Sequence, residues 1–348
     1  IACCYCIKCL ELRLLSCKLA VSFCSIVVAK MGGTSSQPNI IQPGDLRLLI
    51  ENPEVTPGDE IIGTVGLQVR EVIGVDTLHI EFIGEIESEF TETSTDGDGT
   101  TNERNYREHM YIINYKCPLY VWPDRAVQPG QYSLPFQLKV PLGLPSSLNW
   151  AQGSTKARVN YKVTCWLIPG IQDTINIGVQ QRENLLNQSL KLFRSAAMRY
   201  CCFSKGSISY SLELNKGSFF TGEDVVLSIN LDCSQAKTRP PFLRGYLHYR
   251  ILLTAQGHRK YIGGKVDTNR VAVDRVANVQ TLTLVLKLQP DRVNTLSSLN
   301  TGLIKSDFFV FIEPVNPSSC LSYDQFNFEM PLVVNSKLQF QPPPIPPP

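Results

Sequence analysis

Histidine, charged residues and long apolar runs are all scarce in this chain. Its 348 residues include four histidines, and charged residues make up 18% of the composition, below the roughly 25% usual in soluble domains. No run reaches the ~18 consecutive apolar residues of a membrane-spanning helix. Hydrophobic residues nevertheless make up 43%, which is enough for a sizeable core and excludes wholesale disorder. At about 150 residues per domain, the length predicts two domains.

The sequence also lacks the short motifs of common catalytic chemistry. It contains no G-x-S-x-G nucleophile elbow, no Walker phosphate loop and no H-E-x-x-H motif. Cys6 and Cys9 have the spacing of a zinc pair, but no second pair or histidine follows them at a suitable distance. Residues 96–99 begin like a calcium loop, yet Arg107 stands where the last glutamate ligand is required. We therefore expect no enzymatic activity, no cofactor and no metal, and the net charge of +2 gives no reason to expect nucleic-acid binding.

The N-terminal segment 1–44 carries two competing targeting signals. Residues 31–36 match the M-G-x-x-x-S signal for N-myristoylation, with Gly32 as the acylated residue if translation begins at Met31. The apolar run Leu19–Ala29 instead resembles a secretory signal that is cleaved after Ala29. The six cysteines after residue 44 show no spacing typical of a disulfide framework, so we favour a cytoplasmic protein.

The body of the chain alternates apolar and polar residues in twos. Segment 61–69 places Ile61, Val65, Leu67 and Val69 on one face. Period two with many β-branched residues and Gly/Pro punctuation predicts antiparallel strands with one buried face, and many such short strands favour β-sandwiches. The same alternation recurs in segments 132–140, 159–165, 226–231 and 282–288.

Two stretches of the chain resemble each other at an offset of 164 positions. Residues 46–50 align with 210–214, and the turn Pro-Gly-Asp-Glu at 57–60 aligns with Thr-Gly-Glu-Asp at 221–224. Because a slip of one residue would turn a strand's core face to solvent, the retained apolar phase indicates a shared strand–turn–strand unit. The duplication predicts an N-terminal sandwich over 45–180, a linker over 181–205, a C-terminal sandwich over 206–335 and a Pro-rich tail over 336–348.

The linker 181–205 has helix-like leucine spacing and several basic residues. It is predicted to be a connection or a last strand at the domain junction, with a basic segment facing a membrane as the alternative.

The N-terminal half resembles an arrestin. That family's N-terminal domain has a Pro-Gly-Asp/Glu turn before an I-x-G-x-V strand, and residues 57–65 read PGDEIIGTV. It continues with P-G-x-Y-x-[FL]-x-F and then P-x-x-L-P-S-S, which residues 129–136 and 141–147 match as PGQYSLPF and PLGLPSS. The residues that carry this resemblance are Pro57, Gly58, Asp59, Pro129, Gly130, Tyr132, Phe136, Pro145 and Ser146.

The second half resembles the C-terminal domain of the same family. Cys201-Cys202-Phe203, Gly222 and Glu223, and the closing MPLVV at 330–334 have counterparts there, and the cysteine pair is most like the arrestin-domain-containing (α-arrestin) branch. The resemblance covers residues 45 to 335. It implies an all-β fold of two tandem antiparallel β-sandwiches with immunoglobulin-like architecture.

The resemblance implies a non-enzymatic intracellular adaptor that binds membrane-protein cargo. Such a protein links cargo to endocytic or endosomal trafficking and ubiquitination machinery, and it lies in the cytoplasm or peripherally at the plasma membrane or endosomes. Its expected partners are the cargo, a ubiquitin ligase or a trafficking coat. A coat subunit like the arrestin-like subunit of retromer stays open. So does a secreted two-sandwich adhesion or recognition protein, which requires Leu19–Ala29 to be a signal peptide and predicts disulfides among the body cysteines.

Two polar regions are candidate binding surfaces. Residues 91–107 read as a long polar loop between strands, and the arrestin resemblance implies that a loop near this position faces the receptor. A solvated connector is the alternative. The candidate cargo contacts are Glu92, Asp96, Asp98, Glu103, Arg104 and Arg107.

Charge is unevenly distributed between the halves. Residues 45–115 contain 16 acidic and 4 basic residues, a net of −12, whereas residues 236–275 contain 9 basic and 2 acidic residues, a net of +7. The basic strip is expected to meet anionic lipid headgroups or phosphorylated tails, or to complement the acidic region across the domain interface. The candidate anion-binding residues are Lys237, Arg239, Arg244, Arg259, Lys260 and Lys265.

Overall fold

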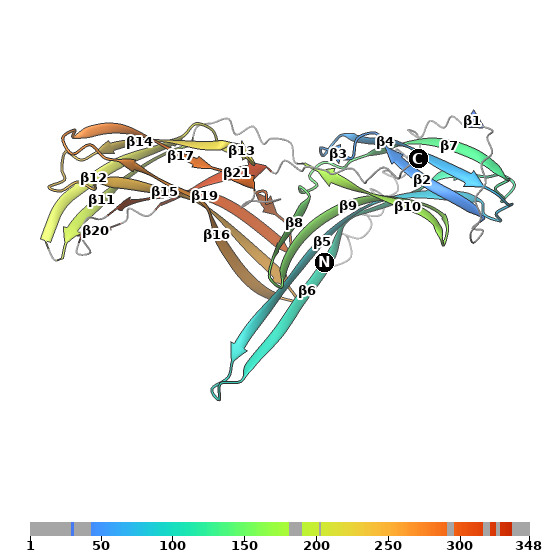
Figure 1. The fold of residues 1–348 in the computed structure, drawn as a ribbon, viewed down its shortest axis with the longest axis horizontal. Helices are drawn as coiled ribbons and strands as arrows, with labels where there is room; N and C mark the ends of the chain where they lie inside the picture. The colour runs from blue at the N-terminus through green and yellow to red at the C-terminus, as the bar shows by residue number, and fades with distance from the viewer. Residues whose placement is uncertain are drawn as a thin grey trace, which may run out of the picture.

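The computed structural model describes residues 29–30, 43–180, 190–201, 203–290, 296–315, 321–324 and 328–335 (Figure 1). These residues form four β-sheets, two from each half of the chain. The two pairs of sheets form the tandem β-sandwiches that the sequence predicts, so the predicted all-β fold class is confirmed.

The N-terminal sandwich contains a sheet of order β1-β7-β4-β2 and a sheet of order β3-β10-β9-β5-β6, with β8 paired to β9. Its strands are β1 (Ala29–Lys30), β2 (Gly44–Ile50), β3 (Glu54–Val55), β4 (Glu60–Val69), β5 (Thr77–Thr95), β6 (Thr101–Val121), β7 (Gly130–Lys139), β8 (Leu148–Gln152), β9 (Thr155–Ile168) and β10 (Ile171–Val179).

The C-terminal sandwich contains a sheet of order β17-β14-β12-β11-β20 and a sheet of order β13-β21-β19-β15-β16, with β18 paired to β19. Its strands are β11 (Lys191–Tyr200), β12 (Phe203–Leu214), β13 (Ser218–Phe220), β14 (Asp224–Asp232), β15 (Phe242–Ala255), β16 (His258–Ala272), β17 (Val279–Lys287), β18 (Leu299–Asn300), β19 (Ile304–Val315), β20 (Leu321–Asp324) and β21 (Phe328–Asn335).

Both sandwiches repeat one topology. The order β7-β4-β2 recurs as β17-β14-β12, and the order β3-β10-β9-β5-β6 recurs as β13-β21-β19-β15-β16. The short strands β8 and β18 hold equivalent places beside β9 and β19. The repeat therefore extends beyond the aligned strand–turn–strand unit to the whole domain. In addition, the C-terminal sandwich carries β11 and β20 beyond β12.

The aligned turn is repeated in its backbone. Gly58 and Gly222 have φ values of 96° and 93°, a left-handed conformation that favours glycine. The amide of Gly58 donates a hydrogen bond to the carbonyl of Val140 at 3.0 Å, and the amide of Gly222 donates to that of Leu288 at 2.8 Å. The turn thus joins equivalent strand ends in both domains.

The carboxylate that follows each glycine is repeated as well. Asp59 Oδ2 accepts the amide hydrogen of Thr56 at 2.9 Å, and Glu223 Oε2 accepts that of Phe220 at 2.8 Å. Either acidic side chain can therefore close the turn onto the strand that precedes it.

The cores contain the apolar faces that the alternation predicts. Ile61, Val65, Leu67 and Val69 are all buried along β4, as expected. Burial also raises the pKa of the Cys165 thiol to about 12, and this residue and Cys233 are buried free thiols.

One buried tyrosine ties a motif turn to the core. The Tyr161 hydroxyl, buried in β9, donates a hydrogen bond to the carbonyl of Pro145 at 2.7 Å. The adjacent Ser146 is buried too. This turn therefore has a packing role in the N-terminal sandwich.

The region predicted as a linker contains a strand. Lys191–Tyr200 forms β11, which pairs with β12 in the C-terminal sheet, while residues 181–189 lie outside the described residues. Helix-like leucine spacing was the wrong signal for this strand because only Ala196 and Met198 are buried along it. A strand with so few buried side chains shows little alternation in its sequence.

Candidate interaction surfaces

Residues 91–107 form a hairpin rather than the predicted loop. Glu92 lies in β5, Glu103, Arg104 and Arg107 lie in β6, and pairing between the strands continues out to Thr95 and Thr101. Of the predicted cargo contacts, only Asp96 and Asp98 lie in the turn. The prediction of a long loop was wrong because backbone pairing forms the ribbon even where both of its faces are polar.

The turn of this hairpin is stabilised by its own polar side chains. The amide of Thr100 donates to Asp98 Oδ1 at 2.9 Å, and Asn102 Nδ2 donates to Asp96 Oδ2 at 2.7 Å. The backbone hydrogen bond lowers the pKa of Asp98. Figure 1 shows the β5–β6 hairpin extending beyond both sandwiches, so its tip is accessible to a partner.

The base of the hairpin contacts the C-terminal sandwich. The ring of Tyr106 stacks on the ring of His258 with a centroid separation of 4.0 Å, and Glu92 Oε2 lies 3.7 Å from His258 Nδ1. Lys260 Nζ donates to the carbonyl of Thr91 at 2.8 Å. Acidic and basic regions therefore meet across the domain interface, one of the two expectations from the charge distribution.

The turn between β15 and β16 completes this interdomain contact. The Gln256 amide donates to Glu108 Oε2 at 2.6 Å, and its side-chain amide donates to the carbonyl of Arg107 at 3.2 Å. Gln256 and Gly257 both have positive φ, as a tight two-residue hairpin turn requires.

The outer face of the N-terminal sheet carries a ladder of ion pairs. Three glutamates on β5 lie between basic side chains of β9 and β6. The hydrogen bond that the Lys156 ammonium donates to Glu89 lowers the pKa of this carboxyl group. Each acidic group on these three rows thus has a cation beside it. The pairs are Lys162–Glu85 at 2.9 Å, Arg158–Glu87 at 3.4 Å, Arg107–Glu87 at 2.7 Å and Lys156–Glu89 at 3.0 Å.

The predicted basic strip is divided among three places. Strands β15 and β16 are long: β16 has 15 residues, and at a rise of about 3.3 Å per residue its first and last Cα atoms are about 46 Å apart. A continuous run of cations in the sequence therefore does not form one patch. Lys237 and Arg239 lie at one end of the sandwich, Arg244 and Lys265 lie on its sheet, and Arg259 and Lys260 lie beside the N-terminal sandwich.

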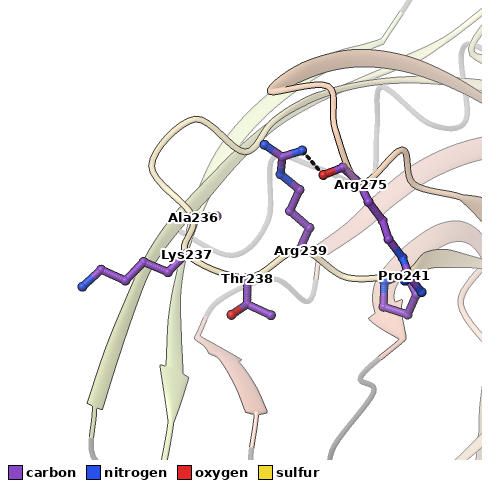
Figure 2. Close-up of a pocket in the computed structure, with 6 residues that line it drawn as sticks. All are labelled: Ala236, Lys237, Thr238, Arg239, Pro241 and Arg275. Carbon is purple, nitrogen blue, oxygen red and sulfur yellow. Dashed lines mark hydrogen bonds between the residues drawn. The ribbon is translucent and has the colours of Figure 1, made fainter.

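The end of the C-terminal sandwich farthest from the β5–β6 hairpin holds a basic depression of about 500 Å³ (Figure 2). Arg239 donates to the carbonyl of Arg275 at 2.5 Å, which holds two loops together. Lys237 extends away from the loop, and its amide donates to the carbonyl of Lys205 at 2.8 Å. The depression is therefore attached to the start of β12.

Exposed apolar side chains lie on the chain segments next to those that line this depression. Tyr200 and Phe203 face each other across the β11–β12 turn, and Phe203 is 72% exposed. Val276 and Val279, at the connection from β16 to β17, are 86% and 66% exposed. We call this region the distal edge, defined by Arg199, Tyr200, Phe203, Lys205, Lys237, Arg239, Arg275, Val276 and Val279.

The remaining motif residues pack rather than bind. Gly130 opens β7, directly after Pro129. The Tyr132 hydroxyl donates to the carbonyl of Gln128 at 2.8 Å, and Phe136 is buried. These residues are the signature of a fold and carry no visible binding chemistry.

Some sequence predictions fall outside the part of the chain that the structure describes. Gly32 and the Pro-rich tail 336–348 lie there, so acylation stays a prediction. Among the described residues, no helix has the length and apolar content to cross a membrane, and no group of three His, Cys, Asp or Glu residues lies close enough to hold a metal ion.

Comparison with known proteins gives a consistent result. Residues 49–169 match the family model described as "Arrestin (or S-antigen), N-terminal domain". The chain is also 23% identical over 230 residues to Arrestin domain-containing protein 17 of Caenorhabditis elegans, in an alignment that covers 59% of this chain and 51% of that protein. It thus spans about half the length of this relative. With two tandem sandwiches of one topology, these similarities support an arrestin-like chain, most similar to the arrestin-domain-containing members of that family.

Proposed function

We propose that this protein is a non-enzymatic adaptor that attaches peripherally to membranes and binds membrane-protein cargo. In this proposal it acts in the cytoplasm, at the plasma membrane or endosomes, and links its cargo to a trafficking coat or a ubiquitin ligase. The likeness to arrestin-domain proteins supports the adaptor role. The buried free thiols of Cys165 and Cys233 favour a reducing compartment over a secreted protein.

The observation that carries the proposal is the composition of the distal edge. Burying an exposed Phe side chain stabilises a complex by about 1.5–3 kcal/mol, and each cation near an anionic lipid surface adds about 1 kcal/mol. Phe203 is exposed and therefore accessible for burial in a bilayer, and Lys237 extends into solvent, where it can meet anionic headgroups. Apolar and basic groups at one end of an elongated molecule match the surface of an anionic bilayer.

In this orientation the β5–β6 hairpin is free for cargo. Figure 1 shows the hairpin leaving the molecule near its centre, with its tip clear of both sandwiches and of the β11–β12 turn. We propose that Asp96 and Asp98 at its tip, together with Glu103 and Arg104 on the adjoining strand, contact the cytoplasmic part of a membrane protein. A myristoyl group on Gly32 would supply a second membrane signal, which stable attachment requires.

The test compares two exposed phenylalanines of one strand pair. Phe193 is 67% exposed and lies seven positions before Tyr200 on β11, about 23 Å from the turn, so Phe193→Ser serves as the matched control for Phe203→Ser. We expect the unmodified chain to float with vesicles that contain phosphatidylserine. We expect Phe203→Ser to lower the bound fraction about tenfold, because the burial of the ring is lost.

Cross-linking in cells tests the cargo part of the same proposal. A photo-reactive residue placed at Asp98 should form adducts with integral membrane proteins, and Phe203→Ser should reduce their yield. Equal flotation of the Phe193→Ser and Phe203→Ser variants would refute docking through the distal edge. Adducts with soluble proteins alone would refute the adaptor role.

A further inference from the structure

The outer face of the C-terminal sheet carries a cluster of aromatic rings. Tyr246 stacks on Phe311 with a centroid separation of 5.4 Å, and His248 lies 5.7 Å from both Tyr246 and Phe309. These residues are cross-strand neighbours on β15 and β19. Buried Leu247 lies between them in the sequence, so the period of two directs the rings away from the core. All four rings are partly exposed.

Two cations cover the faces of these rings. Lys265 Nζ lies 4.7 Å from the centroid of the Tyr246 ring, and Arg250 Cζ lies 5.0 Å from that of Phe309. A ring whose face is occupied by a cation is a poor platform for base stacking, which is how single-stranded nucleic acids bind to sheet faces. The surface therefore favours a ligand that pairs with cations.

This face has more basic than acidic groups. Its acidic residues pair with cations, as Glu313 does with Arg244 at 3.8 Å and Glu329 with Arg250 at 3.2 Å. The charge of Lys265 also acts locally, since burial and then Lys265 lower the pKa of His248. Three outward cations on β16 form no carboxylate pair with any described residue: Arg259, Lys265 and Arg270.

The duplicated sheet of the N-terminal sandwich shows that the scaffold does not require this excess. On the equivalent strands β5, β6 and β9, the glutamates of the ion-pair ladder each have a basic neighbour. One topology thus carries a neutralised face in one copy and an unneutralised aromatic and basic face in the other.

Two adjacent glycines in β16 differ in whether packing explains them. A Cβ atom on Gly264 would lie 2.4 Å from the Tyr249 ring, so packing explains this glycine. A Cβ atom on Gly263 would meet nothing closer than the Tyr249 carbonyl at 3.5 Å. Gly263 pairs with Arg250 and precedes Lys265 by two positions on the same face. Close approach of another backbone or a ligand is one of the reasons for which a glycine stands inside a strand, and it applies where packing does not require the glycine.

We propose that this face, centred on Gly263 between Arg250 and Lys265, is the docking surface for an acidic, extended segment of a partner protein. Carboxylates of the segment pair with the unneutralised cations of β16, and its backbone passes over Gly263. A partner of this kind rests on the proposed adaptor function, although this surface lies apart from the distal edge.

The test uses a fluorescein-labelled twelve-residue peptide of repeating Glu-Glu-Leu and the purified chain in low-salt buffer. We expect fluorescence anisotropy to show saturable binding that Gly263→Val and Lys265→Glu each weaken at least tenfold. Gly263→Val should leave the unfolding midpoint unchanged because an added Cβ atom meets nothing closer than 3.5 Å and valine is favoured in strands. Lys156→Glu, which makes the same charge change on the N-terminal sheet, should bind the peptide like the unmodified chain.

Several outcomes would overturn this proposal. Absence of binding would do so, as would equal binding by the Gly263→Val variant or by a peptide with lysine in place of glutamate. Dimerisation in light scattering that Lys265→Glu abolishes would identify a second copy of the chain as the occupant instead. Vesicle flotation of Gly263→Val should be unimpaired, so a failure here is distinguishable from a failure of the membrane-docking proposal.

Discussion

At the scale of single residues, the two copies of one turn give a controlled comparison of backbone strain. Gly58 and Gly222 share positive φ, but their surroundings differ. A Cβ atom on Gly58 would lie 2.9 Å from Leu142 Cδ2, whereas one on Gly222 would meet nothing closer than Pro290 Cγ at 3.9 Å. The left-handed conformation alone costs an alanine about 1–2 kcal/mol.

We therefore expect Gly222→Ala to lower the free energy of unfolding by about 1–2 kcal/mol. Gly58→Ala should cost at least as much, because Leu142 has to move. Gly66→Ala is the control, since Gly66 lacks positive φ and a Cβ atom there would meet only Arg47 O at 3.9 Å. Urea unfolding of the three variants measures the difference. Equal stability of Gly66→Ala and Gly222→Ala would show that strain at the turn is negligible.

His248 supplies a prediction about pH at the same scale. Burial and the neighbouring Lys265 lower its pKa, while Glu329 opposes them. A lowered pKa in the folded state means that the unfolded chain binds more protons at mildly acidic pH, so this residue makes stability fall as the pH drops through the unfolded value of about 6.5. Lys265→Gln removes one cause and should raise the pKa of His248 in an NMR titration. An unchanged or lower value would show that the charge of Lys265 does not reach this ring.

At the scale of strands and hairpins, burial decides what the sequence could predict. The alternation in β4 and β9 predicts both strands because every second residue is buried in the core, Cys165 included. Alternation does not predict the outer part of the β5–β6 hairpin, because beyond Phe90 and Tyr106 its side chains face solvent on both sides. Its one available signal was the Asp-Gly-Asp-Gly turn between arms rich in Thr and Ser, which is typical of a hairpin.

The strand β11 was predicted only as one alternative, a last strand at the domain junction, for a related reason. Most of its side chains are exposed, and only Ala196 and Met198 are buried, so its sequence has no period of two to detect. The composition of residues 236–275 predicts the excess of cations in the C-terminal half. It does not predict that these cations are divided among three surfaces. That division depends on the register of β15 with β16 and on the length of both strands.

At the scale of the whole molecule, the described contact between the sandwiches is small and polar. It joins residues far apart in the chain, such as Tyr106 with His258 and Glu108 with Gln256, and no periodicity in the sequence predicts such pairs. Polar interfaces of this kind permit relative domain motion unless they are extensive. The angle between the β5–β6 hairpin and the distal edge therefore depends on a few residues of β16 and of the β15–β16 turn.

We expect the double substitution His258→Ala and Lys260→Ala to loosen this angle without unfolding either sandwich. It removes the ring stack on Tyr106 and the hydrogen bond to Thr91, which together contribute about 1–2 kcal/mol in a partly exposed setting. Spin labels placed on β10 and β14 should then give a broader distance distribution, while the unfolding midpoint of each domain stays constant. Arg259→Ala, between the two positions, is the matched control because no contact of Arg259 holds the N-terminal sandwich among the described residues. If the distribution of the double variant stays as narrow as that of the control, the angle between the sandwiches is set elsewhere, and the hairpin and the distal edge form one rigid unit through contacts other than these.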